Sequence, residues 1–239
     1  MINSVKKATD ILQILSDNPG KSLTLGELAE MAEINKSTCA HIMETLCESF
    51  FVEKISRKEG YRLGPWSYML SRKERYHEDL LNVSESILKW LHTKLKVTIF
   101  LDVVCNGRKY VLYYIDNERL LPHSGDTIIP GEMETTATGL LHMAFMDNES
   151  LRKVINPQQM DAKLKSKLAT IKKQKYSYIS YEKLQQQSFA FNITNGIRSI
   201  ASIGVVYPNK YDSPEFQEKI IQLGKTAATE ISRRLTFLK

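Results

Sequence analysis

Cysteine, long apolar runs and a leader segment are all scarce or absent in this 239-residue chain. Its three cysteines, at positions 39, 47 and 105, include no Cys-x-x-Cys pair, which argues against a disulfide framework or a zinc ribbon. No apolar run approaches the ~20 residues that a membrane span needs. The first ten residues turn charged at once, so no secretory signal is visible. We therefore expect a cytoplasmic protein without a membrane partner.

Motifs that carry enzyme chemistry are absent as well. There is no Gly-rich phosphate loop, no nucleophile elbow and no His-Glu-x-x-His sequence. The histidines show no metal-ligand spacing, and His142, within an apolar helical segment, is interpreted as a hydrogen-bonded core residue. We expect no enzymatic activity, no cofactor and no metal site.

The net charge of +6 suggests nucleic acid at first sight, but its distribution does not support that conclusion. Residues 1–78 hold 11 basic and 11 acidic side chains, whereas residues 79–239 hold 22 and 16. Part of this excess is a lysine-rich run at positions 163–175, which we interpret as a solvated helix face, with extra DNA contact as the alternative. DNA binding by the first part must therefore rest on local geometry.

Three short helices are predicted at the start of the chain. Apolar residues recur with helical period over 4–17, and Asn18-Pro19-Gly20 ends that helix. Thr24 and Glu27 have the spacing of a capping box, which predicts a second helix. After a three-residue turn, Asn35 is placed to cap a third helix over 36–48, so the pair forms a helix-turn-helix.

The third helix has an apolar back and a polar front. The stripe at i, i+3, i+4, i+7, i+8 and i+11 consists of Cys39, Ile42, Met43, Leu46, Cys47 and Phe50. The N-terminal part of such a helix enters the major groove in known dockings, which makes Lys36, Ser37, Thr38 and His41 the candidate DNA contacts. Glu44 and Glu48 on the same front favour the alternative that the fold serves protein contacts.

A hairpin follows the third helix. Residues 51–55 and 61–63 are predicted strands, and Gly60 supplies the positive φ of the turn between them. Helices and hairpin together predict a winged helix-turn-helix over residues 1–64, in which Arg57, Lys58 and Arg62 hold flanking phosphates. Residues 65–80 are then predicted as an exposed helical linker.

Residues 81–239 have the pattern of an α+β domain with an antiparallel sheet flanked by helices. Asn106-Gly107 predicts a hairpin turn, and residues 125–131 a loop. The expected helices are 81–95, 138–146, 151–175 with an interruption at Pro157, and 214–238. The expected strands are 97–103, 110–115, 176–181, 188–193 and 200–207.

The chain resembles IclR-type transcriptional regulators. The matching segments are residues 4–12, 23–29, 35–38 and 60–64, with a weaker match at Thr135-Thr136-Ala137-Thr138-Gly139. The resemblance implies a DNA-binding domain (1–64), a linker (65–80) and a GAF-like effector-binding and oligomerisation domain (81–239). It also implies a homodimer or dimer of dimers on a palindromic double-stranded operator, acting as a repressor or an activator. The effector would be a small metabolite, most often an organic or aromatic acid.

The same resemblance implies effector contacts. Backbone N–H groups near Ala137, Thr138 and Gly139 would hold a carboxylate, which agrees with the anion preference of helix N-termini. Glu182, Gly204 and Val206 stand at further pocket positions of the family. Departures such as Leu140 in place of the family's lysine leave two alternatives open: a constitutive regulator with a vestigial pocket, or a metabolite-binding module whose winged helix only mediates assembly.

Overall fold

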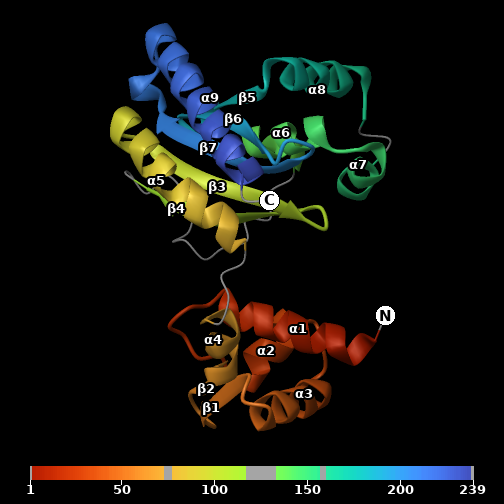
Figure 1. Cartoon of the computed structure of the whole chain (residues 1–239). Helices are drawn as coiled ribbons and strands as arrows, with labels where there is room; N and C mark the ends of the chain where they lie inside the picture. The colour runs from red at the N-terminus through yellow and green to blue at the C-terminus, as the bar shows by residue number, and fades with distance from the viewer. Residues whose placement is uncertain (1, 73–76, 117–132, 157–159, 238–239) are drawn as a thin grey trace. The chain divides into compact units, whose positions relative to one another are not determined.

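The computed structural model describes residues 2–72, 77–116, 133–156 and 160–237, and the chain divides into two compact units, 1–76 and 77–239 (Figure 1). The loop expected at 125–131 and the interruption at Pro157 lie outside the described residues. Within the described ranges, no helix combines the length and the apolarity needed to span a bilayer. Each unit has its own core and is considered by itself.

The first unit is a winged helix-turn-helix, as predicted. Its elements are α1 (Asn3–Ser16), α2 (Leu25–Met31), α3 (Lys36–Glu48), β1 (Val52–Ser56), β2 (Gly60–Leu63) and α4 (Pro65–Arg72). The three first helices enclose a small apolar core that includes Ile11, Leu28 and Met43. The antiparallel hairpin β1–β2 forms the wing.

Both predicted helix caps are present. The Thr24 hydroxyl accepts the Glu27 N–H at 3.3 Å, and the Glu27 carboxylate accepts the Thr24 N–H at 2.7 Å, which completes the capping box of α2. The Asn35 side chain accepts the Thr38 N–H at 2.7 Å and so fixes the start of α3. These bonds satisfy amide groups that a helix start otherwise leaves without partners.

The wing is tied to the segment before α2. Leu23 and Tyr61 exchange two backbone hydrogen bonds of 2.9 and 2.8 Å, which adds an isolated bridge to the hairpin. Gly60 has the predicted positive φ, +90°, and a Cβ there would lie 2.2 Å from the Leu23 carbonyl oxygen. Position 60 therefore requires glycine for its dihedral angle and for its close contact.

One member of the predicted apolar stripe is not buried. Phe50 is 59% exposed, whereas Cys39, Met43 and Leu46 of the same stripe are buried. The reason is local: α3 ends at Glu48, and Phe50 adopts a left-handed φ of +60° in the turn that follows. The helical period therefore stops before it reaches Phe50.

The second unit contains a five-stranded antiparallel sheet with the order β4-β3-β7-β6-β5. Asn106 and Gly107 form the β3–β4 turn with positive φ angles, as predicted. The strands are β3 (Thr98–Cys105), β4 (Arg108–Ile115), β5 (Tyr176–Tyr181), β6 (Gln186–Thr194) and β7 (Ser199–Pro208). The helices are α5 (Glu78–Leu95), α6 (Ala137–Phe145), α7 (Asn148–Val154), α8 (Ala162–Gln174) and α9 (Pro214–Phe237), with 3₁₀ turns η1 (Met133–Thr135), η3 (Glu182–Leu184) and η4 (Asn209–Tyr211).

Helices cover both faces of this sheet (Figure 1). Alternate strand residues such as Ile99, Leu101 and Val103 pack with α5 and α9, and the opposite face packs with α6 and α8. Two element boundaries differ from the expected ones. Residues 78–80, expected in the linker, belong to α5, where Leu80 is buried. The helical pattern over 151–175 corresponds to two helices, α7 and α8.

Candidate nucleic-acid interface and effector site

The tip of α3 is exposed, as DNA reading requires. Lys36, Ser37 and His41 are exposed and Thr38 is half-buried, while the opposite side of the helix is part of the core. Ser37 and His41 are four residues apart, so they lie on the same face of the helix. The structure thus presents a short hydrogen-bonding surface at the N-terminal end of α3.

Lys36 lies beside the start of α2. A methyl group at Gly26 would stand 3.9 Å from Lys36 Cε, so the small residue at position 26 leaves room for the lysine side chain. Lys36 has no ion-pair partner within the described residues. His41 Nδ1 stands 3.9 Å from a Glu44 carboxylate oxygen, but both side chains are more than 70% exposed, so this contact contributes little.

The wing supplies cations in two different states. Arg57 and Lys58 are exposed at the β1–β2 turn and have no carboxylate partner among the described side chains. Arg62 instead pairs across the hairpin with Glu53, to whose carboxylate Nε and Nη2 both donate at 2.9 Å. This hydrogen bond raises the pKa of Arg62. A phosphate contact by Arg62 has to share or displace Glu53.

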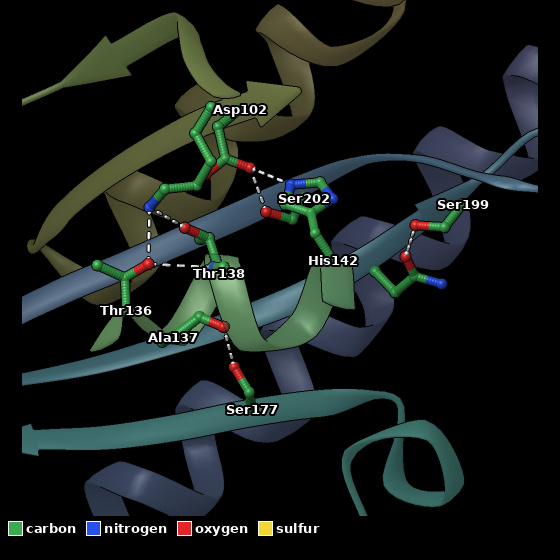
Figure 2. A network of polar contacts seen from close by, with 11 residues as sticks. Asp102, Thr136, Ala137, Thr138, His142, Ser177, Ser199 and Ser202 are labelled. Atoms are coloured by element: carbon green, nitrogen blue, oxygen red, sulfur yellow. Dashed lines mark hydrogen bonds and ion pairs between the residues drawn. The ribbon is translucent and has the colours of Figure 1, made fainter. Parts of the chain in front are cut away.

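The start of α6 carries a buried cation that sequence reasoning missed. Lys109, on β4, donates to the hydroxyl groups of Thr136 (2.8 Å) and Thr138 (3.1 Å) and is 6% exposed. Burial lowers the pKa of Lys109, and the nearby Asp102 carboxylate partly opposes that shift. Thr136 also caps α6 by accepting the Gly139 N–H at 3.2 Å (Figure 2).

A second buried group lies one turn further along α6. The Asp102 Oδ1 atom contacts His142 Nε2 at 2.8 Å and accepts a hydrogen bond from the Ser202 hydroxyl (Figure 2). Burial raises the pKa of Asp102, but His142, Lys109 and Ser202 outweigh it, so the pKa is lowered overall. The interpretation of His142 as a hydrogen-bonded core residue is confirmed. A charged residue within an otherwise apolar strand was the available sequence signal for Asp102.

The three effector residues expected at the start of α6 lie together but are closely packed. Ala137, Thr138 and Gly139 are all buried, and the Ala137 carbonyl accepts a hydrogen bond from Ser177 (Figure 2). A Cβ at Gly139 would lie 2.1 Å from the Met133 carbonyl oxygen. Burial raises the pKa of Tyr181, and a backbone hydrogen bond from Ala137 acts in the opposite direction. The Ala137 amide therefore already has a partner.

The other three expected effector residues are not part of this cluster. Glu182 is exposed in η3. Val206 is buried and pairs with Thr98 in the sheet. Gly204 pairs with Phe100, whose ring would lie 2.0 Å from a Cβ at position 204. Gly204 and Val206 alternate with Ser202 and thus share the α6 face of the sheet.

The two units define a class of protein: a winged helix-turn-helix domain joined to a separate α+β domain. Residues 4–56 match the family model of the IclR helix-turn-helix domain. Residues of the chain are 27% identical, over 157 positions, to the HTH-type transcriptional regulator TtgV of Pseudomonas putida; this match covers 66% of the chain and 60% of the relative's length.

Solved structures share the fold over the whole chain. An IclR transcriptional regulator from a Silicibacter species has a TM-score of 0.77 and 21% identity, covering 98% of this chain and 96% of its own. An IclR homolog of Microbacterium hydrocarbonoxydans, complexed with 4-hydroxybenzoate, has a TM-score of 0.78 and 14% identity, covering 97% and 98%. Together, the matched domain, the curated relative and the common fold identify the chain as an IclR-family transcriptional regulator.

Proposed function

We propose that this chain binds double-stranded DNA through the tip of α3 and the wing, and regulates transcription in response to a small acid. The observation that carries the proposal is the exposed set of Lys36, Ser37 and His41 on a helix whose other side is anchored in the core. Two such tips in a homodimer, or four in a dimer of dimers, would meet the half-sites of a palindromic operator about one helical turn or a multiple apart.

The DNA contacts are tested by removing two cations that have no internal partner. Duplexes are first selected from a random-sequence pool, and their affinity is then measured by gel shift at several salt concentrations. We expect Lys36→Ala and Arg57→Ala each to weaken binding by about 5- to 100-fold and to reduce the salt slope by about 1, because each removes one phosphate or base contact.

The matched control is Lys21→Ala, which removes an exposed lysine of the same unit outside the proposed contacts. It should leave affinity nearly unchanged. Failure to enrich any duplex sequence would contradict the DNA-binding proposal. If ligand binding persisted in that case, the chain would be a metabolite-binding module whose winged helix mediates assembly.

For the effector, we propose a small organic or aromatic acid whose carboxylate lies at the start of α6. The helix N-terminus favours an anion, and Lys109 supplies a buried positive charge beside Thr136 and Thr138. The similar fold complexed with 4-hydroxybenzoate supports this ligand class. Such an acid switches the regulator only if it binds one arrangement of the DNA-binding domains more tightly than another.

A second candidate is a constitutive regulator with a vestigial pocket. Specific contacts favour it, because the amide groups that an incoming carboxylate needs are already engaged. The Gly139 N–H is bonded to Thr136, and the Ala137 amide is bonded to Tyr181. A bound acid has to compete with these internal partners.

Tyr181→Phe distinguishes the two candidates. If an acid binds the Ala137 amide, removal of the competing hydroxyl should tighten its binding, and Lys109→Met should abolish it. The measurement is thermal unfolding of the full chain with a panel of small acids that includes 4-hydroxybenzoate, since saturation at 100 times Kd stabilises by about 2.7 kcal/mol.

Tyr178→Phe is the matched control, because its hydroxyl is bonded to Gln187 instead of to α6. It should leave the ligand-induced shift unchanged. If no acid stabilises the wild-type chain or the Tyr181→Phe variant, the constitutive regulator is favoured.

A further inference from the structure

A large groove lies at the opposite, C-terminal end of α6. Its volume is about 1040 Å³, and it is bounded by the β3–β4 turn, α7, the end of α8 and the β6–β7 turn, with residues of α9. Proteins hold small ligands in cavities of roughly 300–1,000 Å³, so this groove has room for a molecule much larger than one inorganic ion. None of the six expected effector residues lines it. We call it the basic groove.

Four cations line the basic groove: Lys153, Lys172, Lys175 and Arg198. Lys153 pairs with Glu149 at 2.9 Å, with both side chains at least 65% exposed. The other three have no ion-pair partner within the described parts of the chain.

One carboxylate, Asp147, is also part of the lining, and its own side chain caps α7 by accepting the Ser150 N–H at 2.7 Å. That backbone hydrogen bond is the main cause that lowers the pKa of Asp147, and Arg198 adds to it. With one carboxylate against four cations, the lining has an unbalanced positive charge.

The interior of the groove is polar and mostly neutral. Asn192 and Ser199 are half-buried there, and the Ser199 hydroxyl donates to the Asn192 side-chain oxygen (Figure 2). This bond leaves the Asn192 amide nitrogen without a partner among the described residues. The buried His142 is already bonded to Asp102. The groove therefore combines exposed cations with a hydrogen-bond donor further inside.

We propose that the basic groove is a second ligand site, which takes a small polyanion: a molecule that carries phosphate groups or several carboxylates. Anions would lie among Lys172, Lys175 and Arg198, and a further oxygen would accept from Asn192. This site explains why the last lysines of the lysine-rich run, on α8 and at its C-cap, differ from the earlier ones: they line a groove, whereas Lys163 and Lys165 do not. The proposal does not depend on DNA binding or on the site at the start of α6.

The test is isothermal titration of the full chain with inorganic pyrophosphate and with citrate at about 0.15 M salt, near-physiological ionic strength. We expect saturable binding with one site per chain for at least one of them, weakened at least about tenfold in the Lys172→Gln/Lys175→Gln variant. The two probes distinguish a phosphate ligand from a polycarboxylate. The matched control is Lys163→Gln/Lys165→Gln, which removes the same charge from the same helix outside the groove and should bind as the wild type does.

Three outcomes would overturn the proposal. The first is that neither probe binds saturably. The second is equal weakening in both double variants, which would mean attraction by net charge instead of a built site. The third is that only duplex DNA, and neither small anion, depends on Lys172 and Lys175, which would make the groove a nucleic-acid contact.

Discussion

Ser37→Glu should weaken binding of the selected duplex by about 100-fold. Ser37 is exposed at the second helical position of α3, where the proposed contact with the groove of DNA is closest. A glutamate there loses a hydrogen-bonding contact worth about 1–3 kcal/mol and places a negative charge against the phosphates. Gel shift or fluorescence anisotropy at fixed salt measures the change.

Ser4→Glu is a closely matched control. Ser4 is also an exposed serine at the second position of a helix, α1, so the substitution has the same effect on net charge and a similar interaction with the helix dipole. It should change affinity by less than about threefold, the order expected for an exposed charge away from the interface. Equal effects of the two variants would show that α3 does not read DNA.

Asp102→Ala should destabilise the second unit by about 3–5 kcal/mol. The substitution leaves Lys109 and His142 buried beside each other without the carboxylate that compensates them. Urea unfolding measures the loss. The chain has two tryptophans, Trp66 in the first unit and Trp90 in the second, so a Trp66→Phe background makes fluorescence report on the second unit alone.

Asp102→Asn keeps the shape of the side chain and should lose less than the alanine variant. It also tests the charge through pH. Because the pKa of Asp102 is lowered in the folded state, its ionisation stabilises the fold above about pH 4, the unfolded value, and this contribution disappears as the pH falls further. The wild type should therefore lose stability below pH 4 more steeply than Asp102→Asn. Parallel pH profiles would show that the carboxylate is not ionised in the fold.

Local patterns predicted the first unit well because its structure depends on nearby residues. The Thr24–Glu27 capping box, the Asn35 cap and the Gly60 turn each involve atoms three or four residues apart, or a single dihedral angle. Phe50 was misplaced because helical periodicity does not indicate where a helix ends. The Arg62–Glu53 pair depends on hairpin register, which the pattern of alternation did not specify.

The second unit was predictable as a set of elements, whereas its sites were not. Lys109 contacts Thr136 across 27 positions, and Asp102 contacts Ser202 across 100, so neither pair has a local signature. The six expected effector residues came from family resemblance, and their roles stay predictions. The basic groove combines residues from several separate elements, and lysine spacing along α8 alone did not separate its groove-lining side chains from the solvated ones.

The two hydrogen bonds between Leu23 and Tyr61 have a consequence for how the first unit meets a duplex. They join the wing to the segment that leads into α2, so Arg57 and Lys58 are held at a set spacing from the tip of α3 before any encounter. Little conformational entropy then has to be lost on docking. A side chain at position 60 would separate this junction, and the hairpin would swing as an independent arm.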